Sequence, residues 1–177
     1  MAKKKKTDII PYELMLLTQE EATKLLLEEA KKETPDLQVV EDILAYSPID
    51  VNIKDEWNDT PLMIVAGSKN VKCLKLLLKH PKIDVNVQDD GTTALVSAIG
   101  SLDYVSVKLL LEAGANPDIK DRWGGSVAFD CLSGMMQEYE YADEFEDDTD
   151  YDHHDYATME KIKKLLNRYS KEKHFLF

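Results

Sequence analysis

Apolar residues recur along the chain in short runs with helical spacing, separated by turns that contain Asp, Asn, Gly or Pro. An i, i+3, i+4 spacing places such residues on one face of a helix. The first run includes Ala22 and Leu26, and residues 18–21 before it have the form of a capping box. Pro35 then interrupts the chain, and residues 39–44 form a second run of the same kind. The pattern therefore predicts short helices that come in pairs.

The strongest regularity is a segment that recurs every 33 residues. The pattern of residues 60–66 recurs at residues 93–99 and again at residues 126–132, with small or apolar residues at matching positions. A fixed period of this length indicates stacked repeats. One two-helix unit cannot bury its apolar face alone, so about three or more units must stack.

Thr60-Pro61-Leu62 resembles the opening of the inner helix of an ankyrin repeat, and Gly91 and Gly124 stand in the turns before the later copies. The resemblance is specific over about residues 50–134. It implies an all-α, ankyrin-like solenoid of about four helix-turn-helix repeats with short β-hairpin-like turns. The repeat domain implied is residues 18–170, with repeats at approximately 18–54, 55–87, 88–120 and 121–170, after an N-terminal tail and cap (1–17) and before a C-terminal tail (171–177).

The last repeat carries a long acidic insertion, residues 137–156, which we expect to lie between its two helices and outside them. The outer-helix pattern, residues 159–169, begins about 20 residues later than the period requires. Ten of the eighteen residues from 138 to 155 are acidic and none is Lys or Arg, so this segment carries most of the net charge of −12. Two interpretations remain open: a docking loop for a basic partner, or a solvated loop. Its aromatic residues favour the docking loop, and the candidate contacts are Tyr139, Tyr141, Phe145 and Tyr151.

The resemblance also implies that the hairpin turns and inner helices bind a partner protein. Trp57 and Trp123 occupy the same repeat position, two periods apart. Two arrangements remain open for them: aromatic anchors at an interface, or rings packed over the adjacent hairpin. Met63 stands where the family usually has His, so we expect it on the binding side. The remaining candidate contacts are Glu56, Asp59, Asp89, Asp90, Thr92 and Arg122.

Charge and composition exclude several classes of function. With 22 Lys and Arg against 34 Asp and Glu, the chain is a poor ligand for nucleic acid, which requires clustered cations. No apolar run approaches the ~18 residues of a membrane span, and no signal-peptide pattern follows the lysines at positions 3–6. Those lysines are either a solvated tail or a nuclear address. Cys73 and Cys131 are too few for a disulfide scaffold, and we expect them to be buried reduced thiols.

Catalytic and metal-binding motifs are missing from the sequence. Asp148, Asp150 and Asp152 begin like a calcium loop, but His153 replaces the required Gly and Met159 the final Glu. We therefore expect no metal, no cofactor and no enzymatic activity. The expected function is a protein-protein interaction module, an adaptor or scaffold, that binds a partner with a basic surface. The alternative is an inhibitor or immunity-type protein that neutralises a basic enzyme, and in either case we expect a cytoplasmic monomer.

Overall fold

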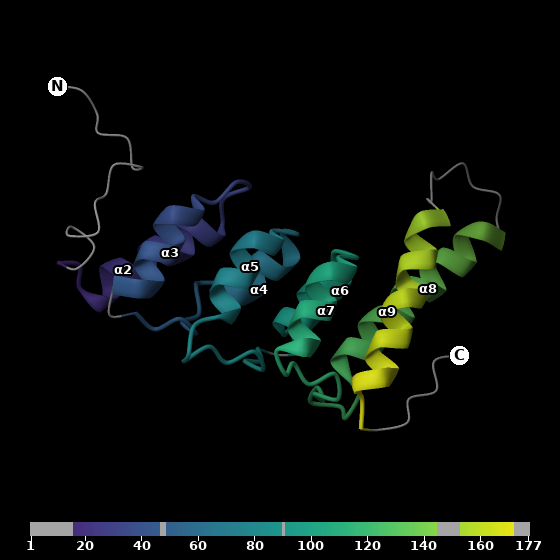
Figure 1. Ribbon diagram of the computed structural model, residues 1–177. Helices are drawn as coiled ribbons and strands as arrows, with labels where there is room; N and C mark the ends of the chain where they lie inside the picture. The colour runs from purple at the N-terminus through teal and green to yellow at the C-terminus, as the bar shows by residue number, and fades with distance from the viewer. Residues whose placement is uncertain (1–15, 47–48, 90, 145–152, 172–177) are drawn as a thin grey trace.

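A computed structural model describes residues 16–46, 49–89, 91–144 and 153–171 of the chain. Over these residues the fold is all-helical, with four consecutive helix pairs stacked side by side (Figure 1). The helices are α2 (Gln19–Ala30), α3 (Leu37–Tyr46), α4 (Pro61–Gly67), α5 (Val71–Leu78), α6 (Ala94–Gly100), α7 (Tyr104–Glu112), α8 (Val127–Glu144) and α9 (His153–Tyr169). The predicted ankyrin-like solenoid is confirmed.

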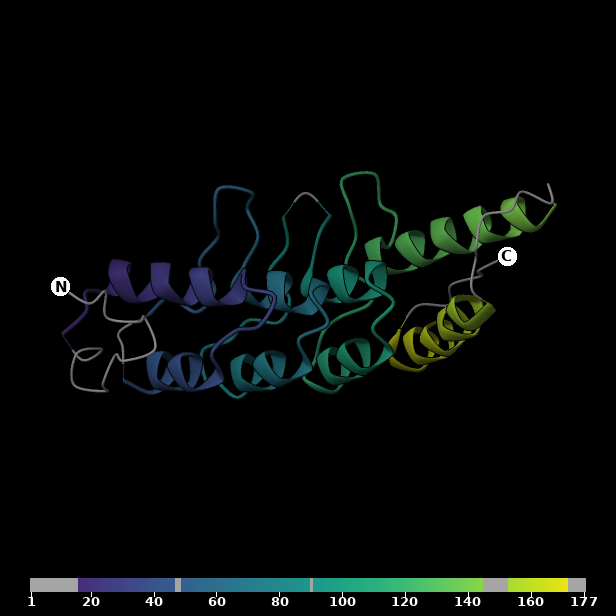
Figure 2. The same cartoon turned by 90° about the horizontal axis from the view of Figure 1, so that it is seen from above.

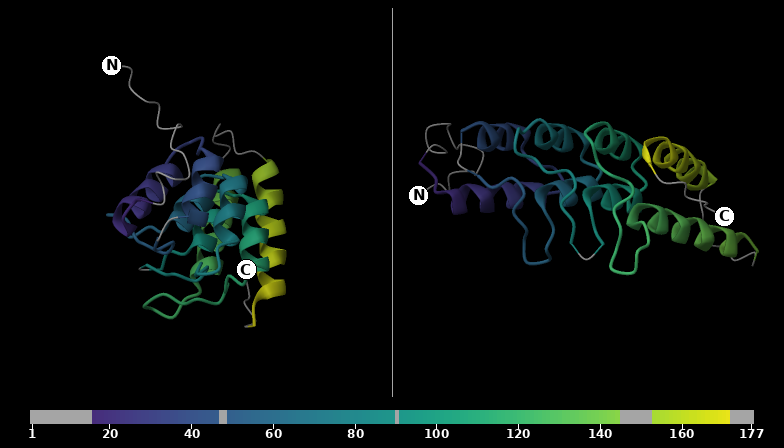
Figure 3. Two further views of the ribbon diagram at one scale, coloured as in Figure 1. Left: turned by 60° about the vertical axis from the view of Figure 1, so that its left-hand side comes forward. Right: turned by 90° about the horizontal axis from the view of Figure 1, so that it is seen from below.

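Each pair contributes one helix to an inner row and one to an outer row. Seen from above, α2, α4, α6 and α8 form the inner row, and α3, α5, α7 and α9 form the outer row (Figure 2). The hairpin turns between repeats project from the inner row, on the side away from the outer row (Figures 2 and 3). The turns and the outer helices therefore lie on opposite sides of the molecule.

The inner helices begin where short polar side chains cap them. The Thr60 hydroxyl accepts the Met63 amide at 3.2 Å, and the Thr93 hydroxyl accepts the Val96 amide at the same distance. Pro61 follows Thr60 at a position where the missing N–H costs nothing. In α2 the predicted capping box is present, because Thr18 accepts the Glu21 amide and the Glu21 carboxylate accepts the Thr18 amide.

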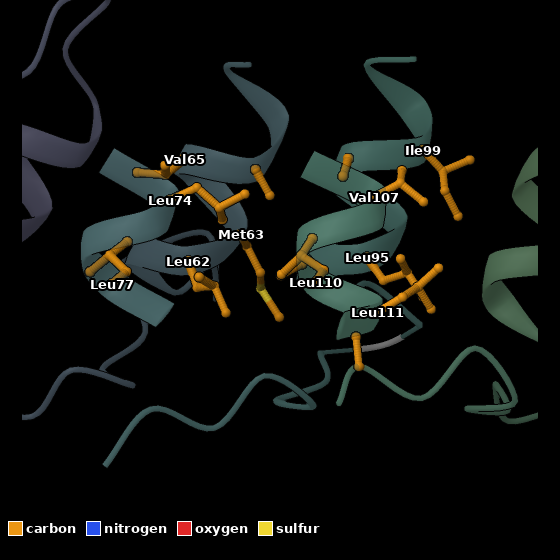
Figure 4. Close-up of a cluster of buried hydrophobic side chains, with 14 of the residues drawn as sticks. Leu62, Met63, Val65, Leu74, Leu77, Leu95, Ile99, Val107, Leu110 and Leu111 are labelled. Atoms are coloured by element: carbon orange, nitrogen blue, oxygen red, sulfur yellow. The ribbon is translucent and has the colours of Figure 1, made fainter. Parts of the chain in front are cut away.

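The core is a continuous apolar seam between neighbouring repeats. Leu62, Leu95 and Ala128, at equivalent repeat positions, are each only 1% exposed and belong to one buried cluster. They lie on α4, α6 and α8, which pack against one another in that order. Leu77 and Leu110 of the outer helices are completely buried against the same cluster (Figure 4). The 33-residue period is thus the period of the core.

Asparagine side chains join the closing turn of each repeat to the next. Asn52 donates to the Lys82 carbonyl at 2.8 Å and accepts the Asp84 amide at 2.8 Å. Asn86 makes the same pair of bonds one repeat later, donating to the Gly114 carbonyl and accepting an amide of the following turn. These bonds satisfy backbone groups that the short turns leave unpaired.

The last pair differs from the expectation for residues 138–155. The expectation that this whole segment lies outside the helices is wrong at both ends, because α8 continues to Glu144 and α9 already begins at His153. Tyr139 is 7% exposed, and its ring centroid lies 5.1 Å from that of Tyr156 on α9. The predicted outer helix is present as α9, whose C-terminal end is tied back by the Lys171 amide to Asp118 at 2.8 Å.

The two cysteines are free thiols at different depths. Cys73 is buried, as predicted, whereas Cys131 is half-buried. Burial, with a smaller contribution from Glu29, raises the pKa of Cys73 to about 11. Glu29 itself is 2% exposed and accepts a hydrogen bond from the Asp36 amide at 3.1 Å.

Candidate partner-binding surface

The first and third hairpin turns are built around an aspartate at the same repeat position. The Asp55 carboxylate accepts the Trp57 and Asp59 amides at 2.9 and 3.0 Å. The Asp121 carboxylate accepts the Trp123 and Gly125 amides at 2.8 and 3.0 Å. Each tryptophan is therefore presented by a turn that its own aspartate holds in shape.

In all three turns the same repeat position holds a residue in the left-handed backbone conformation. Its φ is 63° at Asn58, 100° at Gly91 and 87° at Gly124. Glycine and asparagine adopt this conformation at the lowest cost. In the middle turn, Asp89 and Thr92 exchange backbone hydrogen bonds at 2.6 and 3.0 Å. The turns are thus hairpin-like, as the repeat pattern predicted.

Both tryptophan side chains are exposed to solvent. Trp57 is 74% exposed and Trp123 is 81% exposed. The guanidinium of Arg122 lies 5.0 Å from the Trp123 ring centroid, within the range of a cation–π contact. The rings are therefore not packed over the adjacent hairpin.

Polar contacts connect successive turns. Lys31 at the end of α2 pairs with Asp55 at 2.7 Å. Lys54 of the first turn reaches the second, pairing with Asp89 at 3.3 Å and donating to the Gln88 carbonyl at 3.0 Å. The Gln88 side chain in turn donates to the Lys120 carbonyl at 3.0 Å. These contacts join each hairpin turn to the next.

The first turn concentrates negative charge. Desolvation is the largest influence on Asp55 and would raise its pKa, but Lys31 and the amides of Trp57 and Asp59 together lower the pKa below 3.8. The pKa of Asp59 is raised by desolvation and by the charges of Asp55 and Asp89. Ionised Asp59 is therefore held in an unfavourable field, which a nearby cation would relieve.

The structure separates the predicted contact residues into surface and core. Glu56 and Arg122 are exposed on the turns, with Asp59, Asp89 and Thr92 half-buried beside them. Two expectations are corrected by burial. Met63 is 2% exposed, and its sulfur accepts the Thr60 amide at 3.4 Å, so it belongs to the core.

Tyr139 is likewise removed from the candidate surface, because its ring packs between α8 and α9. Asp90, Phe145 and Tyr151 lie outside the described residues, and Tyr141 is described only as part of the α8 backbone. The turn-to-turn contacts of Lys54 and Gln88 were not predicted. A sequence signal existed, because Lys54 and Lys120 stand at the same repeat position, two periods apart.

A family model described as ankyrin repeats (3 copies) matches residues 14–121, which is more than half of the chain. The chain belongs to the ankyrin-repeat family. Ankyrin repeats are protein-protein interaction modules and are generally not enzymes. The matched residues include the first two hairpin turns and end at Asp121 in the third turn, ahead of Trp123 and the last helix pair.

Curated relatives share parts of the ankyrin-repeat region. A putative ankyrin repeat-containing protein of Treponema pallidum is 36% identical over 100 residues, which cover 56% of this chain and 33% of that protein. A zinc finger CCCH domain-containing protein 24 of rice is 49% identical over 70 residues, 37% of this chain and 9% of that protein. Human transient receptor potential cation channel subfamily A member 1 is 35% identical over 65 residues, 36% of this chain and 6% of the channel. The chain thus spans a third or less of the length of these relatives.

The described residues carry neither a grouped set of metal ligands nor a membrane-spanning helix. They contain no group of three or more His, Cys, Asp or Glu side chains placed to hold a metal ion. Among them, no helix combines the length and apolar character that crossing a membrane requires.

Proposed function

We propose that this ankyrin-repeat protein is an adaptor that binds a basic surface of a partner protein through its hairpin turns. The observation that carries the proposal is the pair of exposed rings, Trp57 and Trp123, on turns of the same construction. Exposed indoles are rare on a monomer surface, and tryptophan is enriched among the residues that dominate interface energies. The proposed state of the free protein is a cytoplasmic monomer.

The charge of the first turn supports a basic partner. Glu56 is exposed beside Trp57, and Asp59 has a raised pKa because desolvation and neighbouring carboxylates disfavour its charge. A cationic side chain placed between the first two turns would relieve that repulsion. The ten acidic residues between 138 and 155 add to the attraction at longer range.

The test is affinity capture from an extract of the source cells, using the intact protein and a Trp57→Ala/Trp123→Ala variant. A specific partner should be retained by the intact protein and lost by the variant, with its affinity reduced at least tenfold, or about 1.4 kcal/mol. Val105→Ala is the matched control, because Val105 is an exposed apolar residue (48%) on the outer helix α7, away from the turns. Equal retention by all three proteins would refute the proposal.

An inhibitor of a basic enzyme is the second candidate, favoured by the density of acidic residues. Ionic strength separates the two functions. A charge-driven inhibitor should lose affinity steeply between low and high salt, whereas an adaptor whose affinity comes mainly from the two indoles should lose less. Inhibition of a captured enzyme in an activity assay would establish the second candidate.

A further inference from the structure

The outer face of the second repeat has a charge opposite to that of the chain as a whole. Residues 60–83 contain five lysines and no Asp or Glu, in a protein whose net charge is −12. All five side chains are exposed, and within the part of the chain that the structure describes none of them makes an ion pair. They are Lys69, Lys72, Lys75, Lys79 and Lys82.

An open groove of about 210 Å³ lies beside these lysines, between the C-terminal ends of α3 and α5. Its walls are mostly apolar and include Leu44 and Ala45 from α3 and Leu76 from α5. Pro81 and the exposed Lys79 also line it. The helices α3 and α5 are neighbours in the outer row, and among the residues that the structure describes no further helix covers this apolar surface (Figures 2 and 3).

Two further groups border the groove. His80 is half-buried, its Nδ1 accepts the Lys82 amide at 3.3 Å, and burial together with the Lys82 charge lowers its pKa. The lowered pKa favours the neutral imidazole over the charged form. Glu41 on α3 is the one acidic side chain among the lining residues.

The outer helices on either side of α5 do not share this unpaired positive charge, although α9 at the end of the outer row also carries three lysines and an arginine. On α7, Lys108 is partnered by Glu112 at 3.8 Å, and α3 carries Glu41 and Asp42. The acidic turn residues lie on the other side of the inner row (Figure 2). An anionic ligand is thus attracted to α5 and repelled from the acidic first turn.

We propose that the groove between α3 and α5 is a second binding site, which takes an acidic segment of a partner protein. One apolar side chain of that segment sits between Leu44 and Leu76, and flanking carboxylates meet Lys75, Lys79 and Lys82. The apolar groove favours a peptide, because a peptide side chain can fill it. The charged surface of a membrane or of a nucleic acid duplex would leave the groove empty. Lysine suits the role, since its flexible ammonium pairs with carboxylates without the paired geometry that arginine imposes.

This site is independent of the turns, so the protein can join an acidic segment on one side to a basic surface on the other. The two partners approach from opposite sides of the inner row and do not compete for space. The inference does not rest on the function proposed for the tryptophans.

The probe is a short fluorescent peptide in which one phenylalanine is flanked on both sides by aspartates and glutamates, and fluorescence anisotropy measures its binding to the full chain. Lys75→Glu/Lys79→Glu should weaken binding at least tenfold, because two attractions become repulsions. Ala45→Trp, which fills the groove without changing its charge, should weaken binding about fivefold. Glu41→Gln should strengthen binding about twofold.

Matched controls separate a site from general attraction to an acidic peptide. Lys108→Glu changes an exposed lysine on the neighbouring helix α7 and should leave the affinity within about twofold. A peptide with alanine in place of phenylalanine should bind at least about fivefold more weakly. Circular dichroism confirms that each variant keeps its helices, and amide shifts of the unmodified protein on peptide addition should map to the ends of α3 and α5.

Several results would overturn the proposal. Equal binding of the phenylalanine and alanine peptides, or unchanged binding by Lys75→Glu/Lys79→Glu, would remove the groove as a site. Amide shifts confined to other helices would do the same, even if a variant failed to fold. Preferential binding to phosphatidylserine vesicles or to a DNA duplex at the same lysines would assign the face to a different ligand class.

Discussion

The rings of Tyr139 on α8 and Tyr156 on α9 lie 5.1 Å apart, tilted by 39°, and they extend the buried seam past the point where the repeat period ends. An aromatic pair of this kind contributes about 0.5–1.5 kcal/mol beyond the area it buries. The start of the acidic insertion is therefore part of the folded core.

Replacing Tyr139 by Ala should lower the free energy of unfolding by about 3 kcal/mol, because it removes a buried ring and leaves a cavity beside Tyr156. Urea denaturation followed by circular dichroism measures the loss. Glu138→Ala is the control, since Glu138 is exposed on the same helix and should cost less than about 0.5 kcal/mol. Equal stability of the two variants would mean that α8 ends before Tyr139 in solution.

Leu77 and Leu110 fill the same place in consecutive repeats, and both are completely buried. Replacing either by Ala should cost about 2–5 kcal/mol of unfolding free energy, by loss of buried area and creation of a cavity. Val105→Ala, at an exposed site on α7, should cost less than about 0.5 kcal/mol. A cost for the leucine variants as small as that of the control would contradict the register of the outer helices.

Asp55 should titrate below its ordinary pKa of 3.8, because Lys31 and two backbone amides stabilise its charged form. A carboxyl with a lowered folded-state pKa stabilises the fold above the unfolded-state pKa, and this stabilisation is lost as the pH falls through the folded-state value. Lys31→Met should raise the pKa of Asp55, since desolvation then acts with less opposition.

NMR titration of the side-chain carboxyl carbons measures these values. Lys24→Met is the control, because Lys24 is another exposed lysine of α2 and makes no ion pair with the described residues. An Asp55 pKa at or above 3.8 in the unmodified protein would show that the Lys31 contact does not persist in solution.

Cys73 should resist thiol reagents while the protein is folded. With burial raising its pKa to about 11, roughly one thiol in a thousand is ionised at pH 8, and the thiolate is the reactive form. A Cys131→Ala variant isolates Cys73, and labelling with a chromogenic disulfide should be slow until urea is added. Rapid labelling of the folded variant would place Cys73 outside the core.

The repeat period predicted the stacking because it places equivalent residues in equivalent surroundings. The buried places of Leu62 and Leu95 follow from the 33-residue period, and the Thr60 and Thr93 hydroxyls that cap their helices follow from local backbone chemistry. The positions of Trp57 and Trp123 were also fixed by the period. The period did not fix the direction of their rings, because that direction depends on whether the neighbouring turn has side chains against which a ring can pack.

The wrong predictions concern side chains whose direction, inward or outward, the repeat period does not specify. Met63 was expected on the surface because the family's His is missing, but its flexible thioether turns inward and caps the start of α4. Tyr139 was grouped with the acidic loop because charge was weighed over the segment. Tyr139 stands three residues after Met136, which is also buried, and this helical spacing indicated that Tyr139 belongs to α8.

The contacts of Lys54 and Gln88 have a consequence for selectivity. Because they join the three turns, the separation of Trp57 from Trp123 is set in the free protein, and binding need not restrict it further. A partner whose two contact points match that separation contacts both indoles. A partner with a different spacing contacts only one indole and binds more weakly. Discrimination between partners would then follow from the number of repeats between the tryptophans, so that inserting one more repeat between them would change which protein is accepted.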